Sequence, residues 1–232
     1  MTSENTVLYA ASVVPLKDQE LFRLAYSNAS AGRREKTDRY RFERDKCLSL
    51  GAEMLLQYGL REANTETTAI CGKSDPLGKP KLSNTNLHYN ISHSGDWAIC
   101  TVSDIEVGCD IEKIGSADLN VSKRFFCPEE YSHIAEQASP TEQRLLFYRY
   151  WTLKESFIKA TGLGLTMPLD SFQIQLGERI FVKHSPNQHS YSFAEFGDIP
   201  GYCCAICGIG DIPKVQLKII DLHSLSKIGK QE

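Results

Sequence analysis

The chain has 232 residues and carries 26 Lys and Arg against 29 Asp and Glu, which gives a formal net charge of −3 at pH 7. This balance argues against a general nucleic-acid binder, because such proteins present basic surfaces. No apolar run reaches the length of a membrane-spanning helix, and the first residues lack the basic start and apolar core of a signal peptide. We therefore expect a cytoplasmic protein that does not act at a membrane.

The N-terminal part of the chain predicts strands on both sides of a long helix. Val7–Val14 is mostly apolar and predicts an opening strand. The charged stretch Gly32–Lys46 leads into a helix with apolar residues from Leu48 onward. Leu87–Ile91 alternates apolar and polar residues as a half-buried strand does, and Ala98–Val102 is expected to be its antiparallel neighbour across a Ser-Gly-Asp turn.

The C-terminal part mixes helices with further strands. A strand is predicted near Ile105–Ile111, followed by helices at about Val121–Ala135 and Thr141–Ala160. Later strands are predicted near Phe172–Leu176, Ile180–Lys183, Tyr191–Phe196 and Tyr202–Ile209. Helices mixed with antiparallel strands indicate the α+β class.

Two acidic segments are candidates for a site. Trp151, Glu155 and Lys159 are four residues apart and share one helix face, where a carboxylate among apolar residues is costly unless a cation meets it. At strand spacing, Asp110 and Glu112 point to the same side. Three carboxylate side chains from a strand and a helix suit Mg²⁺, which takes oxygen ligands. Alternatively, the glutamates are only solvated charge pairs with nearby lysines.

Eight cysteines are expected to stay reduced in a cytoplasmic chain. Cys204 and Cys207 match a CxxC pattern, but its interior is apolar and no second CxxC follows. This favours buried strand cysteines over a metal site.

The order Asp-x-Glu, Trp-x-x-Lys-Glu-x-x-x-Lys and Gly-x-Gly-Leu resembles the 4'-phosphopantetheinyl transferase superfamily. Further matching blocks are Gly78-Lys79-Pro80, Asn90-Ile91-Ser92-His93-Ser94-Gly95-Asp96-Trp97, Arg124-Phe125-Phe126 with Glu130-Tyr131, and Pro168-Leu169-Asp170-Ser171-Phe172. The surfactin-type branch implies a monomer of two similar α+β halves, packed about a pseudo-twofold axis with the active site in the cleft between them. The boundary would fall near Ser103, giving halves 1–103 and 104–232.

The resemblance implies a Mg²⁺-dependent transfer of the phosphopantetheine arm of coenzyme A to a serine of an apo carrier protein, with release of adenosine 3',5'-bisphosphate. Asp110, Glu112 and Glu155 match the family's metal ligands. Lys154 and Lys159 match lysines near the pyrophosphate, where cations offset the charge of the departing phosphate.

Glu130 fits the family's F-x-x-x-E spacing and is the candidate general base or an accessory carboxylate beside the metal. A metal-bound water is the alternative acceptor of the serine proton. The neighbouring Glu129 leaves the register open, and a helix N-terminus explains both glutamates.

The nucleotide half of coenzyme A has its own candidate residues in the family pattern. They are Arg33, Lys36, Lys79, Ser92, His93 and Lys159. Cations gathered around a phosphate form charge-assisted hydrogen bonds. Alternatively, the basic segment is a solvated helix start whose charge is balanced by acidic neighbours.

The carrier protein is expected to dock across Ile114–Arg124 and the adjoining helix. Two other functions stay open: a Mg²⁺-dependent nucleotide hydrolase or nucleotidyl transferase, and a coenzyme A-binding regulatory module. Release of phosphopantetheine without a carrier would support the hydrolase. The intact set of carboxylates and Lys159 argues against a module that only binds.

Overall fold

The structure is a computed structural model that describes residues 6–70, 74, 78–185, 187–212 and 214–228. Its first elements are β1 (Val7–Ser12), α1 (Gln19–Asn28), α2 (Ala31–Asp38), α3 (Glu43–Glu62), β2 (His88–Ser94) and β3 (Trp97–Ser103). The chain continues with β4 (Val107–Lys113), α4 (Leu119–Phe125), α5 (Pro128–Ala135), α6 (Pro140–Thr161), β5 (Gln173–Gln175), β6 (Phe181–Lys183), β7 (Tyr191–Phe196), β8 (Tyr202–Ile209), β9 (Gln216–Ile219) and α7 (Leu222–Ile228). The short 3-10 helices are η1 (Val14–Lys17), η2 (Thr67–Ala69), η3 (Gly164–Thr166) and η4 (Leu169–Ser171).

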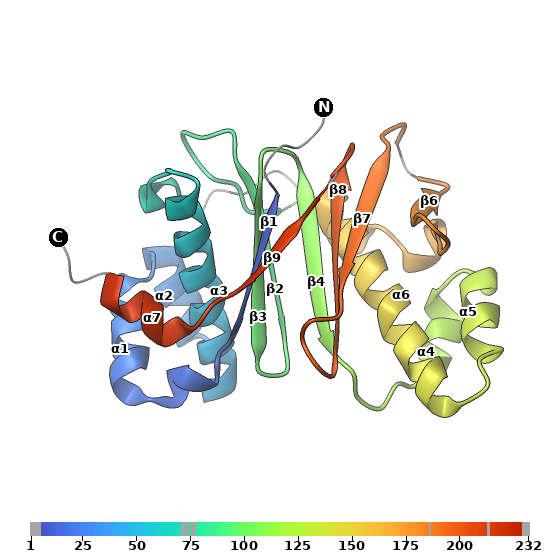
Figure 1. Cartoon of the computed structure of the whole chain (residues 1–232), viewed down its shortest axis with the longest axis horizontal. Helices are drawn as coiled ribbons and strands as arrows, with labels where there is room; N and C mark the ends of the chain where they lie inside the picture. Colours follow the sequence, from blue (N-terminus) through green and yellow to red (C-terminus); the bar gives the residue numbers. More distant parts are fainter. Residues whose placement is uncertain (1–5, 71–73, 75–77, 186, 213, 229–232) are drawn as a thin grey trace.

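Two sheets lie side by side between two groups of helices (Figure 1). The first sheet has the strand order β2-β3-β1-β9, the second has the order β4-β8-β7, and β5 and β6 form a separate pair. Helices α1, α2, α3 and α7 lie on the outer side of the first sheet, and α4, α5 and α6 lie on the outer side of the second. This arrangement confirms the predicted α+β class. Within the described ranges, no helix is long and apolar enough to cross a membrane.

The inner faces of the two sheets share one apolar layer. Leu8 and Ile99 come from the first sheet and Val107, Ile111 and Ile206 from the second, and all five are fully buried. Fully burying one such side chain stabilises the fold by about 1.5–3 kcal/mol. The layer therefore holds the two sheets in a fixed relation and brings β2 next to β4.

Helix α6 packs directly on β4 because the strand carries glycine at the point of contact. A Cβ at Gly108 would lie 2.1 Å from the carbonyl oxygen of Ser156 and 2.4 Å from the backbone nitrogen of Ala160. Both are backbone atoms, so no side-chain rotation can make room. The absence of a side chain here sets how closely the helix approaches the strand.

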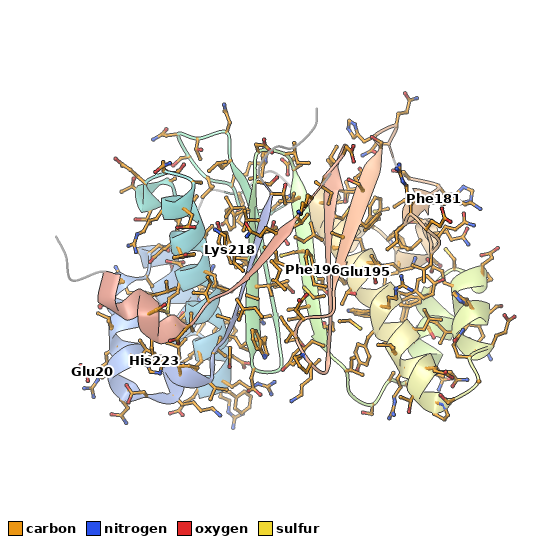
Figure 2. The ribbon with its side chains drawn as sticks, in the orientation of Figure 1. Glu20, Phe181, Glu195, Phe196, Lys218 and His223 are labelled. Carbon is orange, nitrogen blue, oxygen red and sulfur yellow. The ribbon has the colours of Figure 1, made fainter. Side chains whose placement is uncertain are left out.

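The C-terminal segment returns to the first half of the molecule. Strand β9 pairs in parallel with β1, and Leu222 of α7 is buried in the same core cluster as the residues of α1 and α3. Lys218 of β9 lies 2.8 Å from Glu62 of α3 (Figure 2). The sequence analysis predicted neither element, and it placed these residues in the half 104–232. The boundary near Ser103 stays a prediction.

Most predicted elements appear, with one break. The predicted hairpin is confirmed, since β2 and β3 are antiparallel and joined by a turn in which Gly95 has a φ of 60°, a conformation that favours glycine. The helix predicted at about Val121–Ala135 is instead two helices, because Cys127 is extended and Pro128 starts α5. The pseudo-twofold relation of the halves stays a prediction.

Candidate active site

Strands β2 and β4 belong to different sheets and lie next to each other. Side chains of the two strands form hydrogen bonds across the line between them, and we call this line the seam. Ser92 Oγ donates to Asp110 Oδ1 at 2.7 Å, and Ser94 Oγ donates to Glu112 Oε2 at 2.7 Å. These serines alternate along β2 and the two acids alternate along β4, as side chains on one side of a strand do. The prediction that Asp110 and Glu112 point to the same side is confirmed.

Asn90 closes the buried end of the seam. Its Oδ1 accepts from the backbone N–H of Cys109 at 3.0 Å, and its carbonyl oxygen accepts from the Cys109 thiol at 3.3 Å. The sequence analysis singled out neither Asn90 nor Ser94 for this role. Their alternation with Ser92 in the β2 motif was the available signal.

Helix α6 adds a lysine to the seam. Lys159 Nζ lies 2.6 Å from Asp110 Oδ1 and donates to Ser92 Oγ at 3.0 Å and to the carbonyl oxygen of Cys109 at 3.2 Å. Residues predicted from three separate segments therefore meet at one point. Lys159 is 27% exposed and Asp110 is 4% exposed, so the pair lies at the edge of the interior.

The carboxylates of the seam repel one another. Burial raises the pKa of Glu112, and the charges of Asp110 and Glu155 raise it further. Burial and the charge of Asp110 likewise raise the pKa of Glu155. Lys159 opposes both shifts. Carboxylates that raise one another's pKa are stabilised in their charged form when a cation binds between them.

The donor set of the seam fits a hard cation. Asp110 Oδ2 is buried and has no hydrogen-bond partner among the residues described. In the same residues, no group of three or more His, Cys, Asp or Glu side chains is already arranged as metal ligands. Lys159 provides the positive charge beside Asp110. An unpaired buried carboxylate oxygen next to two further carboxylates is suited to Mg²⁺.

Glu130 and Lys154 lie away from the seam, in the interior between α5 and α6. Lys154 Nζ is 2.8 Å from Glu130 Oε2, and both side chains are fully buried. Glu130 also accepts from the backbone N–H groups of Cys127 and Ile174, at 3.0 and 2.7 Å. The amine also donates to the carbonyl oxygen of Phe172 at 2.8 Å. Solvent does not reach either side chain, an arrangement that supports a structural ion pair, and the roles of Glu130 as general base and Lys154 as phosphate contact stay predictions.

A group of cations lies at the α2 side of β2. Arg33 Nε is 2.9 Å from Glu53 Oε2, a partner that the sequence analysis did not identify. Burial lowers the pKa of Lys36, and the charge of Arg33 lowers it further. Burial also lowers the pKa of His93, as do the charges of Lys36, Lys159 and Arg33. Positive charges that lower the pKa values of Lys36 and His93 make this a place that favours an anion.

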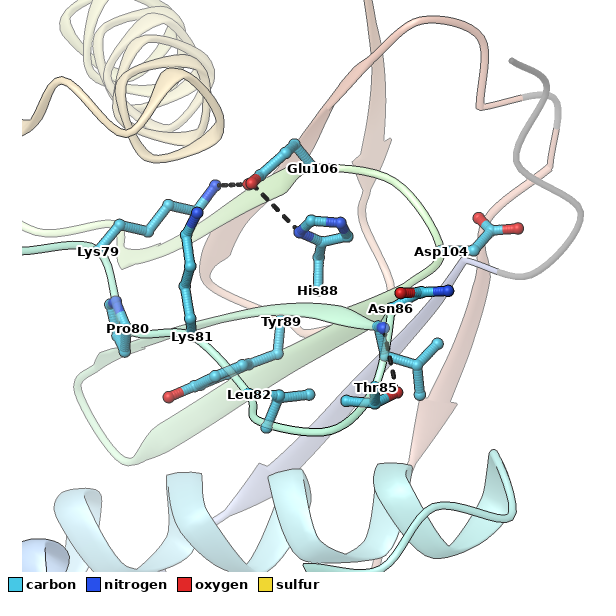
Figure 3. A pocket seen from close by; sticks show the side chains of 11 residues that line it. Lys79, Pro80, Lys81, Leu82, Thr85, Asn86, His88, Tyr89, Asp104 and Glu106 are labelled. Atoms are coloured by element: carbon cyan, nitrogen blue, oxygen red, sulfur yellow. Dashed lines mark hydrogen bonds and ion pairs between the residues drawn. The ribbon is translucent and has the colours of Figure 1, made fainter. Parts of the chain in front are cut away.

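Lys79 forms an ion pair that the sequence analysis did not identify, and its contact with coenzyme A stays a prediction. Its amine lies 2.6 Å from Glu106 Oε2 and donates to the carbonyl oxygen of Ala160 at 3.1 Å. His88 Nδ1 lies 3.2 Å from the other oxygen of Glu106. Figure 3 shows these side chains beside a pocket of about 520 Å³, which Lys81 and Asp104 also line. Sequence reasoning missed Glu106, which carries no motif.

The prediction that the CxxC cysteines are buried in a strand is confirmed. Cys204 and Cys207 are buried on β8, as predicted. The seven cysteines in the described part of the chain are free thiols.

The chain is similar to two protein families and to several known proteins. Residues 106–207 match a family described as "4'-phosphopantetheinyl transferase superfamily", and residues 15–104 match one described as "4'-phosphopantetheinyl transferase, N-terminal". The chain is 37% identical over 203 residues to "4'-phosphopantetheinyl transferase ffp" of Bacillus subtilis, covering 83% of this chain and 87% of the relative. It is 36% identical to "4'-phosphopantetheinyl transferase Sfp" of Bacillus subtilis (strain 168), over the same shares. It is 32% identical to the human "L-aminoadipate-semialdehyde dehydrogenase-phosphopantetheinyl transferase", covering 66% of this chain and 54% of the relative.

Proposed function

The chain belongs to the 4'-phosphopantetheinyl transferase superfamily, and we propose that it performs the transfer at the seam between β2 and β4 with the help of Mg²⁺. The family moves the phosphopantetheine arm of coenzyme A to carrier proteins. The observation that carries the proposal is the meeting of Ser92, Asp110 and Lys159 within 3.0 Å of one another, beside two further carboxylates whose pKa values are raised.

Coenzyme A would lie along β2, with its adenosine 3'-phosphate at Arg33, Lys36 and His93. The lowered pKa values of Lys36 and His93 support this placement, since a bound phosphate relieves the repulsion among these cations. The pyrophosphate would then reach Lys159. Ser92 stays in the proposed site, where its hydroxyl links Lys159 to Asp110.

Asp110, Glu112 and Glu155 would hold Mg²⁺, which supplies charge stabilisation to a pyrophosphate that is being cleaved. The serine hydroxyl of the carrier attacks the phosphorus on the pantetheine side of the pyrophosphate. A P–O bond to that serine forms, and the P–O bond to the adenosine-side phosphate breaks. Lys159 stabilises the negative charge of the departing adenosine 3',5'-bisphosphate.

We assign the serine proton to a water molecule at the seam, which carries it to solvent. Glu130 is unsuited because both of its oxygens accept hydrogen bonds inside the protein. Glu155 is half-buried on α6, and its pKa is raised by burial and by the charge of Asp110. We keep it as a metal ligand, because a carboxylate that meets a cation holds its charge more readily and is a weaker proton acceptor.

The carrier protein would dock over Ile114–Arg124 and the end of α4. Phe125 is 44% exposed there, and the guanidinium of Arg124 lies 5.1 Å from the centre of its ring. An exposed aromatic side chain with a neighbouring cation is a surface that an interface can cover. We further propose that the enzyme acts as a monomer in the cytoplasm, which size-exclusion chromatography and cell fractionation would test.

Incubation with coenzyme A, Mg²⁺ and an apo carrier protein tests the function directly. Intact-mass measurement should show the carrier heavier by one phosphopantetheine group, and the product should be absent when Mg²⁺ is chelated. Release of free phosphopantetheine without any carrier would favour the hydrolase alternative. Binding of coenzyme A without any product would favour the regulatory module.

A further inference from the structure

Glu106 is the centre of an ion cluster that lies outside the proposed site. Its two oxygens contact Lys79 Nζ at 2.6 Å and His88 Nδ1 at 3.2 Å (Figure 3). The amine of Lys79 also donates to the carbonyl oxygen of Ala160 at 3.1 Å. The side chain of Lys79 is 8% exposed and that of Glu106 is 30% exposed, so the cluster is partly protected from water.

The cluster gathers the ends of the three elements that build the seam. His88 is the first residue of β2, Glu106 directly precedes β4, and Ala160 lies in the last turn of α6. The backbone of Glu106 is itself fixed, because its carbonyl oxygen accepts from the N–H of Ile209 at 3.0 Å. Each of β2, β4 and α6 therefore has one end held by the same group of charges.

We propose that Glu106 is a positioning residue for the transfer reaction. Through Lys79 and His88 it fixes α6 and β2 relative to β4, and so sets Lys159 against Asp110. This inference rests on the proposed function of the seam.

The contact with Ala160 has a specific physical basis. The last four carbonyl groups of a helix have no partner inside the helix, and cations are favourable at this negative end. The amine of Lys79 meets one of these carbonyls directly before the turn in which Gly162 ends α6 with a φ of 73°. The amine can hold that position because Glu106 neutralises its charge.

A direct contact between Lys79 and coenzyme A, as the family pattern implies, makes a different prediction. In that case Lys79→Met would weaken the binding of the donor, whereas Glu106→Ala would leave the amine free to bind it. In the positioning role both substitutions break the same cluster, so they act on the chemical step and their effects do not add. A double-mutant cycle separates the two roles.

The experiment compares Glu106→Ala, Lys79→Met and the double variant with the wild-type enzyme, using coenzyme A, Mg²⁺ and an apo carrier. Glu195→Ala is the matched control. Glu195 lies on β7 away from the seam, its side chain is 28% exposed, and it forms an ion pair with Arg149 of α6 at 2.7 Å (Figure 2). Calorimetric titration with coenzyme A counts the binding-competent protein. The kcat is then given per binding site, so an unfolded fraction does not contribute.

We expect Glu106→Ala and Lys79→Met each to lower kcat by about tenfold, since small errors in the position of a reacting group cost one to two orders of magnitude. KM for coenzyme A should stay within about twofold, and the double variant should match the single ones within about twofold. Glu195→Ala should behave as wild type.

Three results would overturn the inference. One is a raised KM with unchanged kcat in Lys79→Met, another is a wild-type kcat in Glu106→Ala, and the third is multiplication of the two effects in the double variant. If Glu106→Ala does not fold, Glu106→Gln replaces it, because the amide keeps the size and an acceptor for Lys79. Absence of transfer in the wild type would instead refute the proposed function itself.

Discussion

Lys154 Nζ lies 2.8 Å from Glu130 Oε2 in an ion pair from which solvent is fully excluded. Removing one charge from such a pair leaves the other buried without compensation, at a cost of about 3–5 kcal/mol. We expect Glu130→Gln and Lys154→Met to lower the free energy of unfolding by this order in urea titrations.

The rate per folded molecule should stay within about threefold in both variants, because neither group touches the reactants. Glu129→Gln is the matched control, since its exposed side chain is next in sequence. A large fall in kcat at unchanged stability would restore Glu130 as the general base.

Asp110→Ala and Glu155→Ala should each lower transfer by about a hundredfold or more, because each removes a charged oxygen from a site that relies on few protein ligands. Thermal unfolding should show that both variants are folded, and titration with Mg²⁺ should show a weaker response. Glu178→Ala, at an exposed position, serves as the control. Full activity at low Mg²⁺ in either variant would contradict the metal assignment.

Dephospho-coenzyme A should bind worse than coenzyme A to the wild type by about tenfold or more, since one charge-assisted hydrogen bond contributes about 1.5–3 kcal/mol. Lys36→Met with His93→Ala should remove most of that difference. Lys17→Met, an exposed lysine on η1, should leave it unchanged.

The preference for the 3'-phosphate should also depend on pH. The pKa of His93 is lowered in the free protein and a bound phosphate raises it, so binding takes up protons and strengthens as the pH falls. Calorimetry in buffers of different ionisation enthalpy measures this uptake. Equal discrimination by the wild type and the double variant would mean that these cations do not hold the phosphate.

Gly108→Ala should destabilise the fold by about 1–3 kcal/mol or more, because the new Cβ meets the backbone of α6 and forces the helix away from β4. Transfer should fall with it, since Lys159 lies on the displaced helix. Gly32→Ala, whose Cβ meets nothing within 4 Å in α2, should instead stabilise by about 0.5–1 kcal/mol. Urea unfolding of the two variants measures the contrast.

Glu106 should stabilise the protein in a defined pH window. Its pKa is lowered from 4.5 to about 2, first by the hydrogen bond with His88 and then by Lys79, against the effect of burial. A lowered carboxyl pKa contributes stability above the unfolded value and loses it as the pH falls through the folded one. The stability difference between the wild type and Glu106→Gln should therefore be constant near neutral pH and shrink between pH 4.5 and 2. A difference that does not change with pH would show that the charge of Glu106 is not involved.

The sequence was sufficient to predict the strands and the helix that form the seam. Asp110 and Glu112 share one side of a strand, and Glu155 and Lys159 share one face of a helix, and both relations follow from residues that are close in sequence. The same spacing could not reveal that Lys154 lies on another face of α6 and is covered by the segment that contains Phe172.

The contacts that the sequence did not predict are mainly those between residues far apart in the chain. The alternative interpretation of the basic segment balanced Arg33 with acidic residues near it in sequence, but the carboxylate that contacts it is Glu53 on α3. Glu106 likewise acquires its role only when the start of β4, the loop before β2 and the end of α6 meet. Strand β9 was missed because its pairing partner, β1, lies at the opposite end of the chain.

The pairing of β1 with β9 has a consequence for synthesis on the ribosome. Residues 7–10 of β1 pair with residues 216–219 of β9, so one edge of β1 has no partner strand until almost every other element has been translated. Until then the first sheet exposes an unpaired strand, which is a template for pairing with other chains. Nascent chains that stall between β3 and β9 therefore present the open edge of β1 to other chains.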